Sequence, residues 1–123
     1  MKKNFNKKIT IIGAGYWGTV IINTLIKIGI KDITVFDINK KNLKILQKKF
    51  SSIKIENNFQ KILKNDLLKD VFVATPPSKN YKIVKMLILN NKNIFLEKPG
   101  FINLDQIKKI KKILNKNSKF MFG

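Results

Sequence analysis

The chain has 123 residues, which is enough to bury a hydrophobic core and fits one domain. It contains no cysteine and no histidine, so disulfides, thiolate metal sites and the commonest general base are excluded. The formal net charge is +19, and all 26 basic residues are lysines.

The lysine excess raises the question of nucleic-acid binding. Clustered basic residues release counterions when they bind a phosphate backbone. Nucleic-acid readers rely on arginine for bidentate and stacking contacts, however, and this chain has none. A solvated lysine surface is therefore the favoured interpretation, and a nucleic acid is disfavoured as a partner.

The first residues give no sign of a targeting segment. Met1 to Lys8 is basic, but the apolar run Ile9 to Ile12 ends at Gly13 and is too short for a signal peptide. No apolar stretch reaches the ~20 residues that a membrane helix needs. The sequence thus predicts a soluble, cytoplasmic protein with no membrane partner.

The N-terminal part of the chain predicts a strand, a turn and a helix. Lys8–Ile12 is a β-branched, apolar run typical of a buried strand, and it enters the glycine turn Gly13–Gly18. Apolar residues recur at helical spacing from Trp17 to Ile28. Gly29 then stands where a left-handed C-terminal cap belongs.

Strands and helices continue to alternate after this unit. Asn103 with Gln106 resembles a capping box before the last helix, and prolines are expected to hold Thr75–Pro77 in a loop. The predicted elements are strands at Ile33–Phe36, Ile53–Glu56, Asp70–Ala74, Asn93–Leu96 and Phe120–Phe122, and helices at Lys40–Phe50, Phe59–Leu63, Tyr81–Asn90 and Leu104–Leu114.

This alternation of apolar strands with amphipathic helices predicts an α/β fold. The expected form is a doubly wound parallel sheet, or Rossmann fold, of about six strands with helices on both faces. No repeat, linker or low-complexity tract interrupts the pattern. Residues 1–123 are therefore expected to form one domain, with no second domain in the chain.

Three glycines, Gly13, Gly15 and Gly18, have the spacing of a dinucleotide-binding turn. The first makes the bend, the second lets a pyrophosphate approach the backbone, and the third lets the helix pack on the strand. The helix N-terminus then offers free N–H groups to phosphates. Asp37, 19 residues after Gly18 at the end of the next strand, is the expected ribose ligand.

This combination predicts NAD as the cofactor. The Asp37 carboxylate would accept hydrogen bonds from ribose hydroxyls and repel a 2′-phosphate, while Lys40 and Lys41 nearby leave NADP open. Two alternatives stay open at this point. The glycines could serve only the turn while Asp37 caps the next helix, and Tyr16 and Trp17 could either pack beside a cofactor or staple the helix to the sheet.

Two further motifs follow the fourth and fifth strands, at the edge of an α/β sheet where ligands collect. They are Thr75-Pro76-Pro77 and Glu97-Lys98-Pro99. The Lys98 ammonium could bind substrate oxygens or assist proton movement, with Glu97 setting its orientation or charge. The alternative is a surface lysine in a lysine-rich chain, and position alone favours that alternative.

In this order the motifs resemble the N-terminal domain of the Gfo/Idh/MocA oxidoreductases, over essentially the whole chain. The residues that carry the resemblance are Gly13-Ala14-Gly15-Tyr16-Trp17-Gly18, Asp37, Ala74-Thr75-Pro76-Pro77 and Glu97-Lys98-Pro99. The resemblance implies an NAD(P)-binding domain and reversible hydride transfer at a carbinol carbon of a small sugar, a cyclitol or a nucleotide-linked sugar.

The resemblance also implies residue roles. Lys98 would be the catalytic residue, near the nicotinamide and the substrate, and no metal is expected. The implied cofactor-binding residues are Gly13, Ala14, Gly15, Tyr16, Trp17, Gly18, Asp37, Thr75, Pro76, Glu97 and Lys98. Members often carry Thr-His after the proline loop, where this chain reads Ser78-Lys79-Asn80-Tyr81, so a contact from that histidine is not expected.

The family's substrate domain, an open antiparallel sheet with the downstream Asp and His of the catalytic set, is expected just after Gly123. We therefore expect a chain that is truncated from a longer gene, or complemented by a separately encoded substrate domain, and weakly active alone. The alternative is a stand-alone dinucleotide-binding or redox-sensing module without catalysis. Assembly into a homo-oligomer is left open.

Overall fold

The computed structural model describes residues 5–123, and residues 1–4 of the basic N-terminal stretch lie outside this range. Six parallel strands form one sheet in the order β3-β2-β1-β4-β5-β6. The strands are β1 Phe5–Ile12, β2 Ile30–Phe36, β3 Lys54–Ile55, β4 Asp70–Val73, β5 Asn93–Leu96 and β6 Phe120–Phe122. The helices are α1 Tyr16–Lys27, α2 Lys40–Lys49, α3 Phe59–Lys64, α4 Pro77–Leu89 and α5 Leu104–Ile113.

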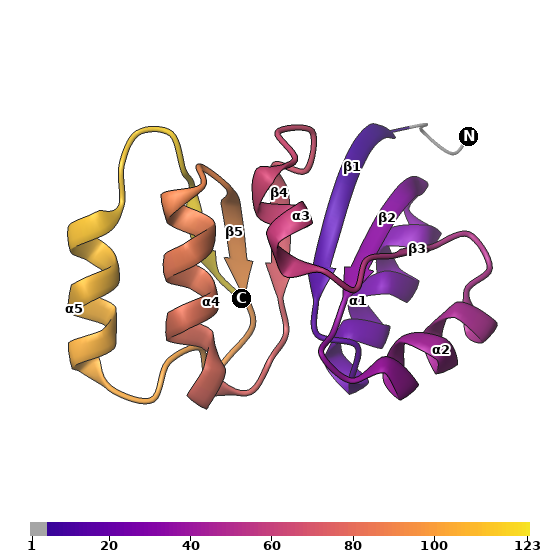
Figure 1. Cartoon of the computed structure of the whole chain (residues 1–123), viewed down its shortest axis with the longest axis horizontal. Coiled ribbons are helices and arrows are strands. Elements are labelled where there is room, and N and C mark those ends of the chain that lie inside the picture. Colours follow the sequence, from indigo (N-terminus) through magenta and orange to yellow (C-terminus); the bar gives the residue numbers. More distant parts are fainter. Residues whose placement is uncertain (1–4) are drawn as a thin grey trace.

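The sheet separates two apolar cores, and helices cover both of its faces (Figure 1). Residues of α1 and α2 pack against β1 and β2 in one core, and residues of α4 and α5 pack against β4 and β5 in the other. Ile11 and Ile12 are adjacent on β1 yet enter opposite cores. Burial on both faces explains the nearly continuous apolar strands, and the doubly wound Rossmann prediction is confirmed.

The central strand β1 is the point where the strand order reverses. It pairs with β2 on one side and with β4 on the other. In open α/β sheets a crevice forms outside the carboxyl ends of the strands at such a switch point. The topology therefore places a cleft where Gly13 follows β1, between Asp37 after β2 and Thr75 after β4.

Most element boundaries match the sequence prediction, but α4 begins at Pro77 and not at Tyr81. The expectation that both prolines lie in a loop was therefore wrong for Pro77. Proline suits the first helical position, since its fixed φ is helical and its missing N–H needs no partner there. The earlier start brings Asn80 into the first turn of α4, where it is buried.

Two predicted caps are confirmed. Gly29 has a φ of +99°, and its N–H donates to the Ile26 carbonyl over 3.1 Å, which ends α1. The Asn103 side chain accepts a 3.0 Å bond from the Gln106 N–H at the start of α5. Gln106 in turn accepts from the Ile102 N–H over 3.2 Å, one residue away from the usual capping-box partner.

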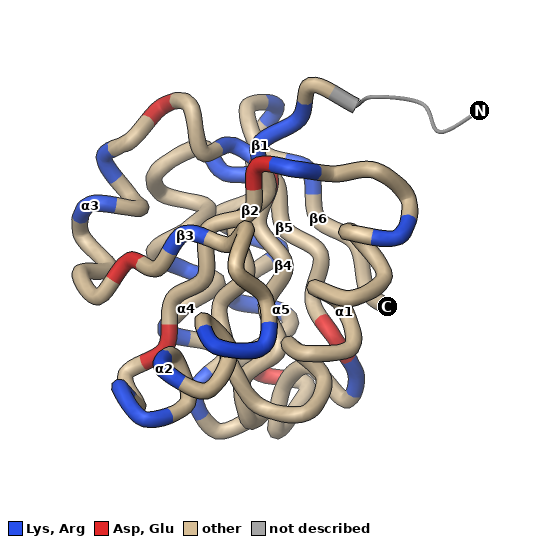
Figure 2. Tube along the Cα trace, turned by 90° about the vertical axis from the view of Figure 1, so that its right-hand side faces the viewer, with Lys and Arg blue, Asp and Glu red and all other residues tan. Residues whose placement is uncertain are grey.

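Lysines lie on most elements of the surface. Figure 2 shows them along β1, α2, α3 and the connecting loops, on several sides of the chain trace. This spread is what a solvated lysine surface produces. Within residues 5–123, no helix combines the length and the apolar character needed to cross a membrane.

Lys92, in the turn that connects α4 to β5, is a buried lysine with 1% of its surface exposed. Its ammonium donates a 2.7 Å hydrogen bond to the Asn65 carbonyl oxygen. Burial lowers the pKa of Lys92 below its ordinary value of 10.5. Between the folded pKa and 10.5 the unfolded chain therefore holds more protons at this site, so stability rises with pH across that window.

The Lys92→Met variant is expected to lose the part of the pH dependence of stability that comes from the titration of Lys92. Its free energy of unfolding, measured in urea from pH 7 to 10.5, should rise less steeply with pH than that of the wild type, because methionine does not titrate. The difference between the two profiles isolates Lys92 from the other lysines. Parallel profiles would contradict the assignment of a depressed lysine pKa.

Candidate functional site

A cleft of about 600 Å³ opens at the carboxyl ends of the central strands. Its walls come from the loops after β1 and β2 on one side and after β4 and β5 on the other. Of the residues predicted from the sequence, the cleft is lined by Gly13, Gly15, Tyr16, Trp17, Asp37, Thr75, Pro76 and Lys98. Motifs far apart in the chain therefore meet at one site.

Glycine stands at the three positions of the turn for different structural reasons. Gly13 has a φ of +110°, and a Cβ there would lie 2.5 Å from the Ala74 carbonyl oxygen. A Cβ on Gly18 would collide with the Gly13 carbonyl oxygen, so the close packing of α1 on the turn requires glycine. A Cβ on Gly15 would meet no protein atom within 4 Å. The fold itself thus requires Gly13 and Gly18, whereas Gly15 leaves open space in the cleft.

Asp37 joins the glycine turn to the loop after β2. Its Oδ2 accepts a 2.7 Å bond from the Ala14 N–H, and its Oδ1 accepts a 2.8 Å bond from the Asn39 N–H. The N-terminal cap of α2 is Asn39, whose side chain accepts from the Lys41 and Asn42 N–H groups. The alternative in which Asp37 caps this helix is therefore wrong. Asp37 has a structural bond at each oxygen, and it also lines the cleft.

Tyr16 and Trp17 form an exposed aromatic pair on the first turn of α1. Their ring centroids are 5.2 Å apart in an edge-to-face arrangement. Tyr16 is 74% exposed and Trp17 is 54% exposed. Rings this exposed do not staple the helix to the sheet, so that alternative is wrong. Both side chains line the cleft instead.

The opposite wall carries the proline loop and the turn after β5. Thr75 and Pro76 line the cleft there together with Lys98 and Pro99. The Lys98 side chain is exposed, and among residues 5–123 it makes no ion pair or hydrogen bond to another side chain. Its ammonium therefore has no structural partner in the described chain that would hold it away from a ligand.

Three predicted residues do not line the cleft. Ala14 and Gly18 lie beneath it, Ala14 donating to Asp37 and Gly18 packing on Gly13. Glu97 is half-buried and its backbone N–H donates to the Val73 carbonyl oxygen over 3.0 Å. The cleft is also lined by residues that sequence reasoning did not assign to the cofactor, namely Ile12, Phe36, Ile38, Asn39, Asn42, Ala74, Pro77, Lys79, Ile83 and Pro99. Those that lie at or just after a predicted strand end could have been found from that position, whereas Asn42, Lys79 and Ile83 lie inside helices.

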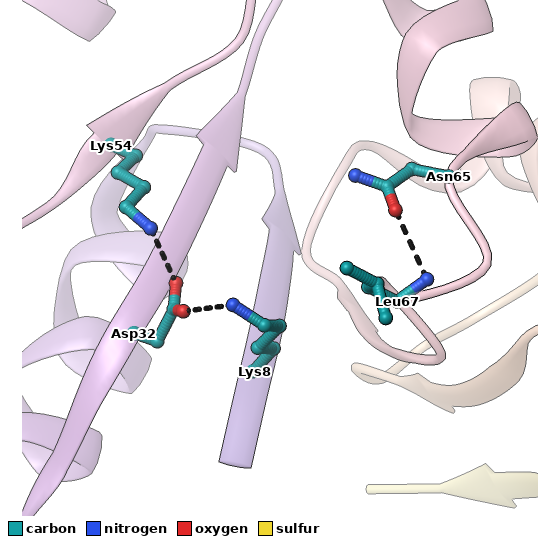
Figure 3. Close-up of polar contacts among 5 residues, drawn as sticks. All are labelled: Lys8, Asp32, Lys54, Asn65 and Leu67. Atoms are coloured by element: carbon teal, nitrogen blue, oxygen red, sulfur yellow. Dashed lines mark hydrogen bonds and ion pairs between the residues drawn. The ribbon is translucent and has the colours of Figure 1, made fainter. Parts of the chain in front are cut away.

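A second, smaller hollow of about 280 Å³ lies nearer the amino ends of the strands. Asp32 lies there between two lysines, and its carboxylate accepts a 2.6 Å hydrogen bond from Lys8 and a 3.2 Å hydrogen bond from Lys54 (Figure 3). The bond from Lys8 holds the pKa of Asp32 below its ordinary value. Because the Asp32 carboxylate is paired with a lysine at each oxygen, this cluster is a surface ion triad and the larger cleft remains the candidate site.

The sequence profile of an oxidoreductase family with an NAD-binding Rossmann fold, Gfo/Idh/MocA, matches residues 7–123. The chain belongs to the Gfo/Idh/MocA family. It carries that family's NAD-binding Rossmann domain, so the resemblance drawn from the motifs is confirmed and NAD is its cofactor type. A curated relative, Oxidoreductase P35 from Formosa agariphila, is 39% identical over 46 residues, which are 37% of this chain and 14% of the relative.

Solved structures share the fold of this Gfo/Idh/MocA domain. A protein from Desulfitobacterium hafniense named as an NADPH-dependent oxidoreductase is 20% identical with a TM-score of 0.85, covering 97% of this chain and 35% of that one. GenD2 from gentamicin A biosynthesis, solved in complex with NAD, is 18% identical with a TM-score of 0.82, and the match covers 100% of this chain and 36% of GenD2. The apo scyllo-inositol dehydrogenase from Lactobacillus casei is 20% identical with a TM-score of 0.77, and the match covers 99% of this chain and 37% of the dehydrogenase.

At these identities the likeness to solved structures shows the fold alone. The chain spans 35% to 37% of the length of these three structures.

Proposed function

We propose that this chain is the cofactor half of an oxidoreductase that transfers hydride between NAD(H) and a CH–OH group of a sugar, cyclitol or nucleotide-linked sugar. The observation that carries the proposal is Gly15, which the fold does not require and which faces a cleft bounded by Asp37 and Lys98. A glycine with no protein neighbour at its Cβ position suits a backbone that a pyrophosphate approaches closely.

The residues of the cleft fit NAD along its length. The N-terminus of α1 at Gly15 and Tyr16 offers backbone N–H groups to the pyrophosphate. Asp37 keeps acceptor capacity on both carboxylate oxygens beyond its two backbone bonds, and we assign it to the adenosine ribose. The nicotinamide half then extends toward Thr75, Pro76 and Lys98 on the opposite wall.

Lys98 is the one residue on that wall that we assign to chemistry. Bound NAD(H) supplies the hydride acceptor or donor. The Lys98 ammonium would orient the carbinol oxygen and stabilise the charge that develops when its proton leaves. Among the residues that line the cleft, the only other charged groups are Asp37 and Lys79. We therefore propose that a separate substrate domain, contiguous or separately encoded, supplies the rest of the catalytic set.

The name of one structural neighbour supports a sugar-like or cyclitol substrate. That neighbour is a scyllo-inositol dehydrogenase. This chain covers only 37% of it, so its name supports the substrate class and not a particular compound. We propose that the holoenzyme takes a polyhydroxylated ring whose hydroxyl carbon can face the nicotinamide.

The scarcity of charged groups on the nicotinamide side favours a second candidate, a dinucleotide-binding or redox-sensing module without catalysis. Among residues 5–123, Lys98 is the only charged residue that lines the wall formed after β5. Sugar-dependent reduction of NAD by the purified chain would exclude this candidate. Tight binding of NAD(H), with no turnover even when substrate-domain protein is added, would favour it over the enzyme.

Titration with NADH tests the proposed function. Trp17 is the only tryptophan and lines the cleft, so its fluorescence should fall while energy transfer excites the bound nicotinamide. The energy-transfer signal should saturate as NADH is added and should disappear when NAD⁺ displaces the bound NADH. An absence of binding at millimolar cofactor would contradict the proposal.

Asp37→Ala is expected to weaken NAD⁺ binding more than NADP⁺ binding. The variant loses the acceptor for the ribose hydroxyls and also the negative charge that opposes a 2′-phosphate. It loses two backbone hydrogen bonds as well, so some loss of stability is expected. The readout is therefore the ratio of the two dissociation constants from calorimetry, which a general loss of folded protein leaves unchanged. An unaltered ratio would remove Asp37 from the ribose site.

A further inference from the structure

The side chain of Asn80 is a buried amide in an otherwise apolar environment. Asn80 lies in the first turn of α4, with 1% of its surface exposed, and Val84 and Leu87 on the same helix belong to the apolar core. A buried amide costs free energy unless its donor and its acceptor both find partners. Its partners therefore indicate why a polar residue stands here.

Both halves of the amide are hydrogen-bonded, and the two partners lie in different loops. The Thr75 hydroxyl donates to the Asn80 Oδ1 over 2.5 Å. The Asn80 Nδ2 donates to the Gly100 carbonyl oxygen over 2.5 Å. Thr75 follows β4 and Gly100 belongs to the turn after β5, so one side chain connects the two loops that form the far wall of the cleft.

The connection reaches the turn close to Lys98. Gly100 lies two residues after Lys98, and its φ of +79° places it in the left-handed region that favours glycine. A Cβ on Gly100 would also collide with the Phe122 ring, so the turn has little room to move toward β6. Its carbonyl oxygen also accepts the hydrogen bond from Asn80. The exposed Lys98 thus lies two residues before a glycine that is held both by its contact with Phe122 and by this hydrogen bond.

We propose that Asn80 is a positioning residue that holds the Thr75 loop and the Lys98 turn in register for the nicotinamide half of the cofactor. This inference rests on the proposed function, because it assumes that NAD lies along the cleft. Asn80 does not line the cleft and acts only through Thr75 and Gly100. The Asp37 and Gly15 end of the cleft is formed by the loops after β1 and β2, and the two Asn80 hydrogen bonds run to neither of these loops.

Asn80→Asp is the variant that isolates the positioning role, because it keeps the shape of the side chain. An ionised carboxylate still accepts from Thr75, but it has no donor for Gly100 and repels that carbonyl oxygen. A protonated carboxyl restores the donor. At pH 8 we expect NAD⁺ affinity to fall about tenfold, the size of one lost hydrogen bond, while ADP affinity stays at the wild-type value.

The pH dependence separates positioning from general damage. Burial favours the neutral carboxyl, so lowering the pH to about 5 should return the variant's NAD⁺ affinity toward that of the wild type at the same pH. Asn80→Leu, of similar volume with neither donor nor acceptor, should lose NAD⁺ affinity at both pH values. Calorimetry with NAD⁺ and with ADP, on folded protein verified by circular dichroism, measures all these quantities.

The outcomes distinguish this inference from the proposed function. If the wild type binds NAD⁺ and Asn80→Asp matches it at pH 8, Asn80 positions nothing and the proposed function stands. If the variants lose NAD⁺ and ADP equally, Asn80 is only structural and the inference is wrong. If the wild type itself does not bind NAD⁺, the proposed function falls and this inference falls with it.

Discussion

Replacing Gly18 by alanine is expected to destabilise the fold by roughly 3 kcal/mol or more, the upper range for overpacking a tight site. Alanine in a helix ordinarily gains about 0.5–1 kcal/mol over glycine. At Gly18 alanine is destabilising instead, because the new Cβ would collide with the Gly13 carbonyl oxygen. Such a loss is a large part of the ~5–15 kcal/mol that holds a domain together. Urea unfolding followed by far-ultraviolet circular dichroism measures it.

Asn23→Ala is the matched control for this prediction. Asn23 is an exposed residue of the same helix α1, and its side chain makes no hydrogen bond among the described residues. We expect its replacement to change the free energy of unfolding by no more than about 0.5 kcal/mol. Equal stability of Gly18→Ala and Asn23→Ala would show that α1 does not pack closely on the glycine turn.

Gly15→Val is expected to leave the fold intact and to remove cofactor binding. Gly15 precedes α1 with a φ of −82°, which any residue can adopt, and its side-chain position faces open space. The cost in stability should not exceed about 1 kcal/mol, the usual effect of a poor helix cap. The branched side chain would occupy the place from which a pyrophosphate reaches the backbone, so NAD⁺ affinity should fall roughly hundredfold, or about 2.7 kcal/mol.

The two glycine variants thus separate folding from binding. Calorimetry with NAD⁺ and unfolding in urea are measured on each protein. Gly15→Ala, with a smaller side chain, should fall between the wild type and Gly15→Val in affinity. Wild-type affinity in Gly15→Val would exclude the pyrophosphate from this turn and would move the cofactor site elsewhere.

Local signals in the sequence were sufficient for most of the fold. The strand β5 and its neighbour β6 have the predicted bounds, because both are short apolar runs with clear breaks on either side. Strand β2 begins at Ile30 and not at Ile33, since Lys31 and Asp32 interrupt its apolar pattern. Strand pairing, with Lys8 opposite Asp32, overrides that local signal.

The candidate site was predictable where motifs lie at strand ends, as for Asp37 and Lys98. What the sequence could not show is burial. Asn80 and Lys92 look like two more polar residues in a chain rich in both types, and only tertiary packing reveals that each is buried and bonded. The family resemblance implied that Glu97 binds the cofactor, but Glu97 does not line the cleft, and its carboxylate lies next to Gly123 at the end of β6.

Nuclear magnetic resonance of the ¹⁵N-labelled chain, titrated with NAD⁺, tests most directly whether this cleft binds the cofactor. The chain of 14.3 kDa is small enough for every amide to be followed. We predict that the shifted amides cluster at Gly13 to Trp17, at Asp37 to Asn39, and around Thr75 and Lys98. Amides that do not shift at millimolar NAD⁺, or that shift only around Asp32 and Lys54, would contradict the account.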